Sequence, residues 1–312
     1  MIEVHGLTKK YGELTAVRNL SFKVESGRIW GLLGPNAAGK TTTMRILTCY
    51  LPATEGKATV AGHDVFEEAD AVKKAIGYLP ENPPLYPEMT VSGYLEFVAA
   101  IKQVPAAGRR AAVDRAVKVT GLQSVRGRLI KNISRGFKQR VGIAQAIIHD
   151  PPVLVLDEPT IGLDPAQIRE IRELIKGLRG AHTVLLSTHI LPEVTQVCDG
   201  VIVLNEGRVV ASGSLAELTA TLEHRHGRDG VVVKLRRGGE EAASLFESAL
   251  PGLASAKADG AEVRLEWPAD RDLRDDVVRV VADRGLGLLE MRPSAMNIEE
   301  LYLQIVSGAS EQ

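Results

Sequence analysis

Cysteine and net charge are both nearly absent from this sequence of 312 residues. Its two cysteines, Cys49 and Cys198, are too few for a disulfide framework, so a reducing compartment is the simpler expectation. The formal net charge at neutral pH is −1, whereas a dedicated nucleic-acid binder usually carries a basic excess. We therefore expect no nucleic-acid partner, although a local basic patch is compatible with this balance.

Long apolar runs are missing as well. A helix that spans a bilayer needs about 20 predominantly apolar residues, but the longest runs, such as Val153–Leu156 and Val201–Leu204, have the length of a buried strand. Residues 1–5 are mixed in character, so we expect no signal peptide at the start of this sequence. We expect a chain that is soluble by itself and reaches a membrane only through a partner.

What the sequence does contain is typical of a globular protein of about two domains. Apolar residues make up 45% and charged residues 25%, which leaves ample material for a buried core. Short apolar runs predict strands at Ile2–Val4, Leu20–Val24, Ile29–Leu33, Lys57–Ala61, Val153–Leu156, Thr183–Ser187 and Val201–Leu204. Helical patterns at 40–49 and 167–178 alternate with these strands, which predicts an α/β fold with a parallel sheet and crossover helices.

The block from about residue 90 to 149 is mainly helical in pattern. Thr90 is a good N-cap in front of apolar residues at helical spacing, and a second helix is expected over 109–120, ending at Gly121. A third helix is expected to begin at Ser134, another good N-cap, and to reach residue 149. This block therefore predicts a helical subdomain.

A domain boundary is predicted near residue 220, where a polar stretch punctuated by glycines begins. Beyond it, strands are expected at 231–235, 253–257, 262–267 and 287–291, and helices at 240–248, 273–283 and 298–306. The order β-α-β-β-α-β followed by a helix fits a small ferredoxin-like α+β module. The sequence thus predicts one domain over 1–220 and an accessory domain over 221–312.

A glycine-containing loop between a strand and a helix carries the clearest chemical signal. The loop matches the phosphate-binding pattern G-x-x-x-x-G-K-[ST] and consists of Gly34, Pro35, Asn36, Ala37, Ala38, Gly39, Lys40, Thr41 and Thr42. In such a loop the backbone N–H groups hold phosphate oxygens, and the following helix adds its positive N-terminus. Lys40 is expected to reach the β- and γ-phosphates of a nucleotide, and the Thr41 hydroxyl to bind Mg²⁺.

Two carboxylates follow the apolar run Val153–Leu156. The C-terminal ends of strands are where open α/β sheets place their ligands, and Asp157 and Glu158 stand at that end. Asp157 is expected to hold Mg²⁺, directly or through water, and Glu158 to polarise an attacking water. Without the phosphate-binding loop upstream, a strand running into a solvated turn would be an equally good reading of this pattern.

The segment Asn132–Arg140 resembles the signature motif of ABC proteins, usually written L-S-G-G-Q, in an S-x-G-x-x-Q-R form. This resemblance covers roughly residues 1–220. It implies that Ser134 and Gly136, at the start of a helix, face the γ-phosphate of ATP held by a second subunit. Without the family context, an ordinary capped helix would be the simpler reading.

Further landmarks occur in the family's order. Tyr11 resembles the aromatic residue that stacks on adenine, and Gly162-Leu163-Asp164-Pro165 resembles the loop that crosses the dimer interface. His189 resembles the switch histidine that contacts the γ-phosphate. Glu81 stands where the family usually has a metal-facing glutamine, so a carboxylate would face the metal region.

Besides Glu81, the loop also departs from the family pattern. Ala37 stands where ABC proteins usually have glycine. If that position needs a positive φ, alanine costs on the order of 1 kcal/mol, and if φ is negative little changes. These two departures affect the expected nucleotide affinity and coupling rather than the resemblance itself.

The resemblance implies a P-loop NTPase of the ABC type, with a mixed-sheet core, an antiparallel β subdomain and a helical subdomain, that binds and hydrolyses ATP with Mg²⁺. It implies a second ABC ATPase subunit, most simply in a homodimer, and a polytopic membrane permease. The protein would then lie in the cytoplasm, peripheral on the inner face of the cell membrane through that partner. The transported substrate lies outside what this sequence specifies.

The signature, the segment 78–81 and the C-terminal module together resemble the ATPases of type-2 ABC exporters, such as those of drug efflux, gliding motility and copper-enzyme maturation. Export is therefore preferred over import. Two alternatives stay open: a soluble ABC ATPase of DNA repair or translation, and a regulator that binds ATP but turns it over slowly. The chain lacks the long coiled-coil insertion, zinc cysteines or second cassette typical of the first alternative.

Overall fold

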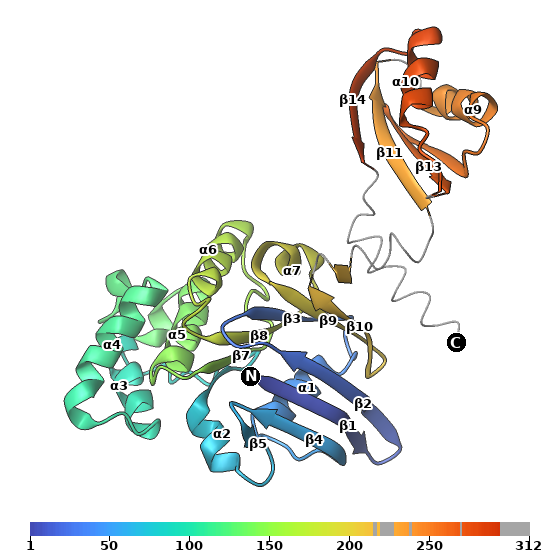
Figure 1. The fold of residues 1–312 in the computed structure, drawn as a ribbon. Coiled ribbons are helices and arrows are strands. Elements are labelled where there is room, and N and C mark those ends of the chain that lie inside the picture. The colour runs from blue at the N-terminus through green and yellow to red at the C-terminus, as the bar shows by residue number, and fades with distance from the viewer. Residues whose placement is uncertain (215–216, 219–227, 237–238, 269, 294–312) are drawn as a thin grey trace. The chain divides into compact units, whose positions relative to one another are not determined.

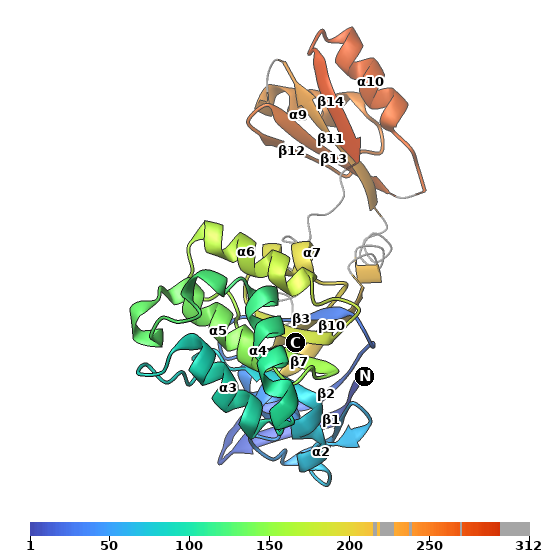
Figure 2. The same ribbon diagram turned by 90° about the vertical axis from the view of Figure 1, so that its left-hand side faces the viewer.

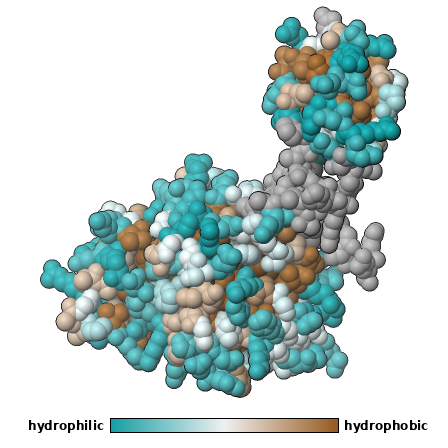
Figure 3. Space-filling model, in the orientation of Figure 1, coloured by the Kyte–Doolittle hydropathy of each residue, from teal (hydrophilic) through white to brown (hydrophobic). Residues whose placement is uncertain are grey.

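The computed structural model describes residues 1–214, 217–218, 228–236, 239–268 and 270–293 (Figure 1). The chain divides into two compact units at residue 215, and each is described by itself. The predicted boundary at 220/221 lies outside the described residues. Hydrophilic side chains predominate over the face drawn in Figure 3. Within the described part of the chain, no helix combines the length and the apolar character needed to cross a membrane.

The core of the first unit is a sheet to which the described residues contribute six strands, in the order β10-β9-β3-β8-β7-β6. Its strands are β3 (Ile29–Leu33), β6 (Ile76–Leu79), β7 (Val153–Leu156), β8 (Thr183–Thr188), β9 (Gly200–Asn205) and β10 (Arg208–Ser214). All neighbours pair in parallel except β10, which runs antiparallel to β9. Every residue of β7 and β8 is buried, as expected for strands covered on both faces. The predicted parallel sheet is confirmed.

A second, antiparallel sheet in the order β2-β1-β4-β5 lies beside it (Figure 1). Its strands are β1 (Ile2–Tyr11), β2 (Leu14–Val24), β4 (Glu55–Val60) and β5 (His63–Asp64). The strand predicted at Ile2–Val4 is too short, because β1 continues through Gly6 to Tyr11. Gly6 has φ 61° and sits where the register of β1 shifts, so the strand continues through a bulge.

Helix α1 (Lys40–Leu47) packs into the core that joins the two sheets. Its buried residue Met44 belongs to one hydrophobic cluster with Leu20 of the antiparallel sheet and Val155 of the parallel sheet. Helix α2 (Ala69–Ala75), helix α6 (Pro165–Lys176) and helix α7 (Leu191–Val197) complete the unit. Because both sheets hold α1, the loop in front of it has a fixed position.

The predicted helical block is present. It contains α3 (Val91–Ile101), α4 (Ala106–Thr120), α5 (Arg135–Ile147) and the short 3₁₀ segments Gln123–Val125 and Ile130–Asn132, and Figure 2 shows its three α-helices packed together. The Thr90 side chain accepts a hydrogen bond from the N–H of Gly93, and that of Ser134 accepts one from the N–H of Phe137. Gly121, with φ 68°, ends α4. Thr90, Ser134 and Gly121 thus act as the predicted caps.

The second unit has the ferredoxin-like order. It comprises β11 (Arg228–Leu235), α9 (Gly239–Ala249), β12 (Ser255–Asp259), β13 (Glu262–Pro268), α10 (Arg274–Asp283) and β14 (Leu288–Pro293). The sheet order is β12-β13-β11-β14, all antiparallel, and Figure 1 shows both helices on one side of it. The fully buried Trp267 and Phe246 anchor a separate core. The helix predicted at 298–306 lies outside the described residues.

Candidate active site

Four loops meet at the carboxyl edge of the parallel sheet. In the register, Leu156 of β7 lies opposite Leu79 of β6 and Leu186 of β8, so the segments that follow these strands start at the same level. Glu81, Asp157 and the loop after β8 therefore come together, with the phosphate-loop pattern following the neighbouring β3. This convergence explains why segments as far apart in the sequence as residues 34 and 189 form one site.

The loop of residues 34–39 is built around Lys40. The Lys40 Nζ donates to the carbonyl oxygens of Gly34 at 2.7 Å and of Pro35 at 3.1 Å, and the side chain is almost fully buried. A Cβ on Gly34 would lie 2.5 Å from the carbonyl oxygen of Leu204, so this position accepts only glycine. The loop thus encloses the Lys40 ammonium, and its backbone packs against β9.

Ala37 occupies the left-handed region, with φ 65°. Of the two alternatives for this position, the positive φ is therefore the one observed. An L-residue in this conformation is less stable by roughly 1–2 kcal/mol than in a right-handed one. Its side chain is exposed, so no packing offsets the strain.

We expect Ala37→Gly to raise the free energy of unfolding by about 1 kcal/mol, since glycine removes the strain at a smaller entropic cost. Urea denaturation followed by circular dichroism measures this difference. Ala38→Gly is the matched control. Ala38 is buried and outside the left-handed region, so the same change should lower the stability. Equal effects of the two substitutions would contradict the assignment of strain to Ala37.

Asp157 lies at the bottom of the site and is 1% exposed. Its Oδ1 accepts hydrogen bonds from the hydroxyls of Ser187 at 2.6 Å and Thr41 at 3.3 Å. Its Oδ2 is buried and has no hydrogen-bond partner within the described ranges. A buried carboxylate oxygen without a partner is costly, and a hard cation bound through oxygen would satisfy it.

Glu158 and His189 form a close pair. The Nδ1 of His189 lies 3.0 Å from Glu158 Oε2, and Lys40 Nζ lies 3.5 Å from Glu158 Oε1. Glu158 is buried and has φ 47°, a strained conformation for a non-glycine residue. Its N–H donates to Ser187 Oγ at 2.8 Å. The Glu158 carboxylate is thus held between a lysine and an imidazole.

A groove of about 940 Å³ runs over these residues. It is lined by the predicted residues Tyr11, Asn36, Ala37, Ala38, Gly39, Lys40, Thr41, Thr42, Glu81, Glu158 and His189. The structure also places Leu14, Thr15, Ala16, Arg18, Ile161 and Glu206 in its wall, which the sequence did not indicate. The Lys9 ammonium lies 5.3 Å from the centre of the ring of Tyr11, which lines the groove. The groove thus joins an exposed aromatic ring to a buried cluster of charges.

Ser134 and Gly136 are not among the residues that line this groove. Ser134 is exposed at the N-terminus of α5, and Gly136 packs against the side chain of Gln167 so closely that a Cβ would lie 2.7 Å from it. Arg135, which stands between Ser134 and Gly136, connects them to the groove. It donates to the carbonyl oxygen of Ile161, a residue of the groove wall, at 3.1 Å. The structure therefore separates the predicted signature residues from the other predicted site residues.

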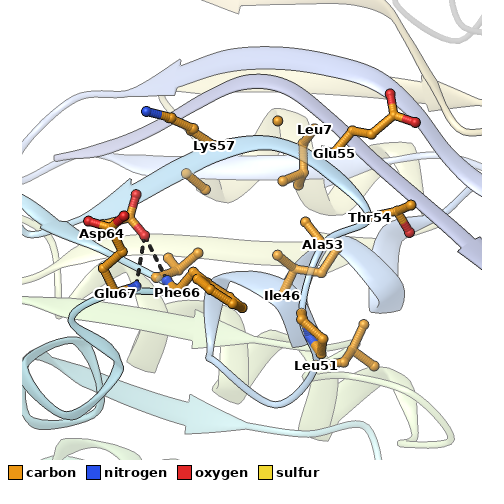
Figure 4. A pocket seen from close by; sticks show the side chains of 14 residues that line it. Leu7, Ile46, Leu51, Ala53, Thr54, Glu55, Lys57, Asp64, Phe66 and Glu67 are labelled. Atoms are coloured by element: carbon orange, nitrogen blue, oxygen red, sulfur yellow. Dashed lines mark hydrogen bonds between the residues drawn. The ribbon is translucent and has the colours of Figure 1, made fainter.

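A second hollow, of about 230 Å³, lies between the antiparallel sheet and the end of α1 (Figure 4). Apolar side chains such as Leu7 and Ile46 line one part, and Asp64 accepts hydrogen bonds from the N–H groups of Phe66 and Glu67. It contains none of the predicted site residues. The groove over Lys40 is therefore the candidate active site.

Sequence reasoning missed Ser187, which contacts both carboxylate residues. A usable signal was present, because Ser187 and Thr188 are polar residues directly after the apolar run Val184–Leu186. That strand, β8, is the parallel neighbour of β7, so its end lies beside Asp157. Tyr78 on β6 also belongs to the surroundings: burial, and then the Asp157 charge, raises its pKa to about 12, so it stays protonated at neutral pH.

Comparisons with known proteins identify a family and similar structures. The family model described as "ABC transporter" matches residues 17–161. The chain is similar to the bacitracin transport ATP-binding protein BcrA of Enterococcus faecalis, at 31% identity over 99% of this chain and 97% of that protein. It is also similar to the daunorubicin resistance ATP-binding protein DrrA3 of Streptomyces coeruleorubidus, at 34% identity over 97% and 95%. A dimeric, post-hydrolysis structure of the ATP-binding cassette MJ0796 with ADP and Pi matches with a TM-score of 0.62 and 26% identity, covering 69% of this chain and 99% of that one.

Proposed function

This chain belongs to the family of ABC transporter ATP-binding proteins, and from that premise we propose how its groove holds and cleaves ATP. It is the ATP-binding and ATP-hydrolysing subunit of an ABC transporter. The observation that carries the proposal is the meeting of the Lys40 ammonium and the Glu158 carboxylate in one groove beside the phosphate-binding loop.

The nucleotide lies along the groove, with adenine at Tyr11 and the phosphates in the loop of residues 34–42. The loop N–H groups and the N-terminus of α1 bind the phosphate oxygens. Lys40 exchanges its contacts with the loop carbonyl oxygens and Glu158 for the β- and γ-phosphates. The same exchange frees Glu158 to face a water molecule.

Mg²⁺ fits the oxygen atoms beside Lys40. Asp157 offers a buried, unpartnered Oδ2, and the Thr41 hydroxyl lies next to the same carboxylate. With Glu81 in the groove wall, Thr41 and Asp157 would hold the ion. When bound, Mg²⁺ neutralises phosphate charge. Within the described residues, no group of three or more His, Cys, Asp or Glu side chains could hold a metal alone. This suits Mg²⁺, which takes few carboxylates and completes its shell with phosphates and water.

Hydrolysis proceeds by attack of water on the γ-phosphorus. Glu158 accepts a proton from the water while the water oxygen bonds to the γ-phosphorus. At the same time the bond between the γ-phosphorus and the bridging oxygen breaks, and that oxygen leaves with ADP. His189 contacts the γ-phosphate and holds the carboxylate in position, and its Nδ1 lies 3.0 Å from Glu158 Oε2 in support of this role. The products are ADP and phosphate, as in the related cassette that was captured with both.

A second copy of the chain completes each site. Ser134 and Gly136 stand outside the groove of their own chain, at a helix N-terminus that suits an anion. In a head-to-tail homodimer they face the γ-phosphate held by Lys40 of the other copy. A dimeric relative supports this arrangement.

The motion of this dimer drives a separate polytopic permease on the cytoplasmic face of the membrane, and the direction is export. The relatives named for bacitracin transport and daunorubicin resistance support this direction. Residues 1–220 form the ATPase domain, and residues 221–312 form the accessory domain.

Affinity purification from native membranes solubilised in mild detergent tests the transporter assignment. We expect a polytopic membrane protein in a stoichiometric ratio, identified by mass spectrometry. The Ala37→Gly chain, which differs only by one exposed methyl group in the nucleotide groove, should recover the same partner. Recovery of soluble partners alone, with the chain in the cytosolic fraction, would favour a soluble ABC ATPase and contradict the proposal.

A further inference from the structure

Glu193 is a buried carboxylate that the mechanism above does not use. It belongs to α7, which follows β8 and His189, and it is 3% exposed. Burying a carboxylate is unfavourable unless hydrogen bonds and a counter-charge compensate it. Its partners therefore indicate what it does.

Two threonine hydroxyls donate to Glu193. The Thr160 Oγ1 donates to Glu193 Oε1 at 2.5 Å, and the Thr188 Oγ1 donates to Glu193 Oε2 at 2.6 Å. Both bonds are buried, and both are in the range of short, charge-assisted hydrogen bonds. Each carboxylate oxygen therefore binds a different segment of the chain.

These two segments carry the reacting groups of the site. Thr160 follows Glu158 by two residues, and Thr188 directly precedes His189. The Thr188 hydroxyl also accepts a hydrogen bond from the N–H of Ile190, so the backbone on both sides of His189 is fixed. One carboxylate thus joins the loop after β7 to the end of β8, and these are the two loops whose side chains meet at 3.0 Å.

We propose that Glu193 is a positioning residue for ATP hydrolysis, which holds the Glu158 carboxylate and the His189 imidazole at their working separation. Glu158 needs such support because its backbone is strained at φ 47°. Ser187 restrains it by accepting a hydrogen bond from the N–H of Glu158. Glu193 restrains it by accepting a hydrogen bond from Thr160, two residues further along the same loop. This inference rests on the assignment of Glu158 and His189 as the reacting pair.

Arg172 supplies the counter-charge. Its NH2 lies 3.6 Å from Glu193 Oε1, and its NH1 donates to Gln196 Oε1 at 2.8 Å. Arg172 is on α6, which begins at Pro165, the last residue of the predicted dimer-interface loop. The same carboxylate therefore also connects the reacting pair to the helix that follows this loop.

The test compares steady-state ATPase kinetics of the full-length chain with those of Glu193→Gln, Thr160→Val and the double variant. We expect kcat to fall between about 10- and 100-fold in each single variant, since small displacements of reacting groups have effects of this size. KM and the affinity for a fluorescent ATP analogue should change less than about threefold, because neither residue touches the nucleotide groove. The double variant should be no slower than the slower single variant, since both changes break one connection.

Glu173→Gln is the matched control, because Glu173 is an exposed acid on α6 that pairs with Lys176 at 2.7 Å. Its kcat should equal that of the wild type. The inference is overturned if Glu193→Gln and Thr160→Val keep kcat within twofold, or if kcat and ATP affinity fall together. Should Glu193→Gln fail to fold, Thr160→Val decides, since valine has the shape of threonine. If the wild type itself shows no ATPase activity, the proposed function fails, and that outcome differs from the loss of the inference alone.

Discussion

Glu158→Gln should reduce kcat for ATP hydrolysis by at least about 100-fold while ATP binding persists. Glutamine keeps the size of the side chain but cannot take the proton of the attacking water, and general-base catalysis contributes about 10²- to 10⁴-fold. Loss of the charge also frees Lys40, which lies 3.5 Å from Glu158 Oε1, for the phosphates. The ATP affinity should therefore be equal or higher, and ATP-bound dimers should accumulate. Phosphate release and gel filtration with Mg²⁺ and ATP measure the two effects.

Glu206→Gln is the matched control for this change. Glu206 lines the same groove and is exposed, so its neutralisation alters the charge of the site without touching the reacting pair. Its kcat should stay within about threefold of the wild type, because Glu158 and His189 keep their contact. Near-normal turnover in Glu158→Gln would show that Glu158 is not the general base. Equal losses of kcat in both variants would show that the effect comes from the loss of a negative charge in the groove.

The fold was predictable where the signal is local. The phosphate-binding loop, its helix and the buried run Val153–Leu156 are each recognisable in fewer than ten residues, because strand length and helix spacing are properties of the segment itself. Strand β6 was missed, since four residues interrupted by Gly77 carry little pattern. The reason for that glycine is distant: a Cβ there would lie 2.0 Å from the carbonyl oxygen of Ala146 on α5. Such a requirement exists only after α5 has packed.

The residues of the candidate site also differ in whether a local motif or a distant contact defines them. Lys40, Thr41 and Asp157 belong to motifs whose spacing reflects the chemistry, and the structure brings them together. Ser187 and Glu193 act through contacts with residues about 30 positions away, and the sequence holds no spacing rule for such contacts. The sign of φ at Ala37 likewise depends on the folded loop, in which the N–H of Ala38 donates to the carbonyl oxygen of Pro35 at 3.2 Å.

Ser134→Asp should abolish ATP-driven dimerisation and lower kcat by at least about 100-fold, although the groove of each chain stays intact. Aspartate caps a helix as well as serine does, so α5 keeps its N-terminus. The added carboxylate, however, would face the γ-phosphate bound by the other copy, and like charges brought together at an interface are strongly unfavourable. Ser134 does not line the groove of its own chain, so the ATP affinity of the monomer should change less than about twofold.

Ser134→Asn is the control that distinguishes the effect of the added charge from the effect of replacing the serine cap. Asparagine is an equally good N-cap and carries no charge. It should retain dimerisation and most of the turnover. The comparison is sharpest when the Glu158→Gln substitution is also present, since ATP then persists and sedimentation reports the dimer directly. If Ser134→Asp forms the dimer as readily as Ser134→Asn, the helix N-terminus of α5 does not face a phosphate. If Ser134→Asp instead weakens ATP binding by the monomer, Ser134 acts within its own chain. Retained monomer binding together with a lost dimer is the result that only a site shared between two copies produces.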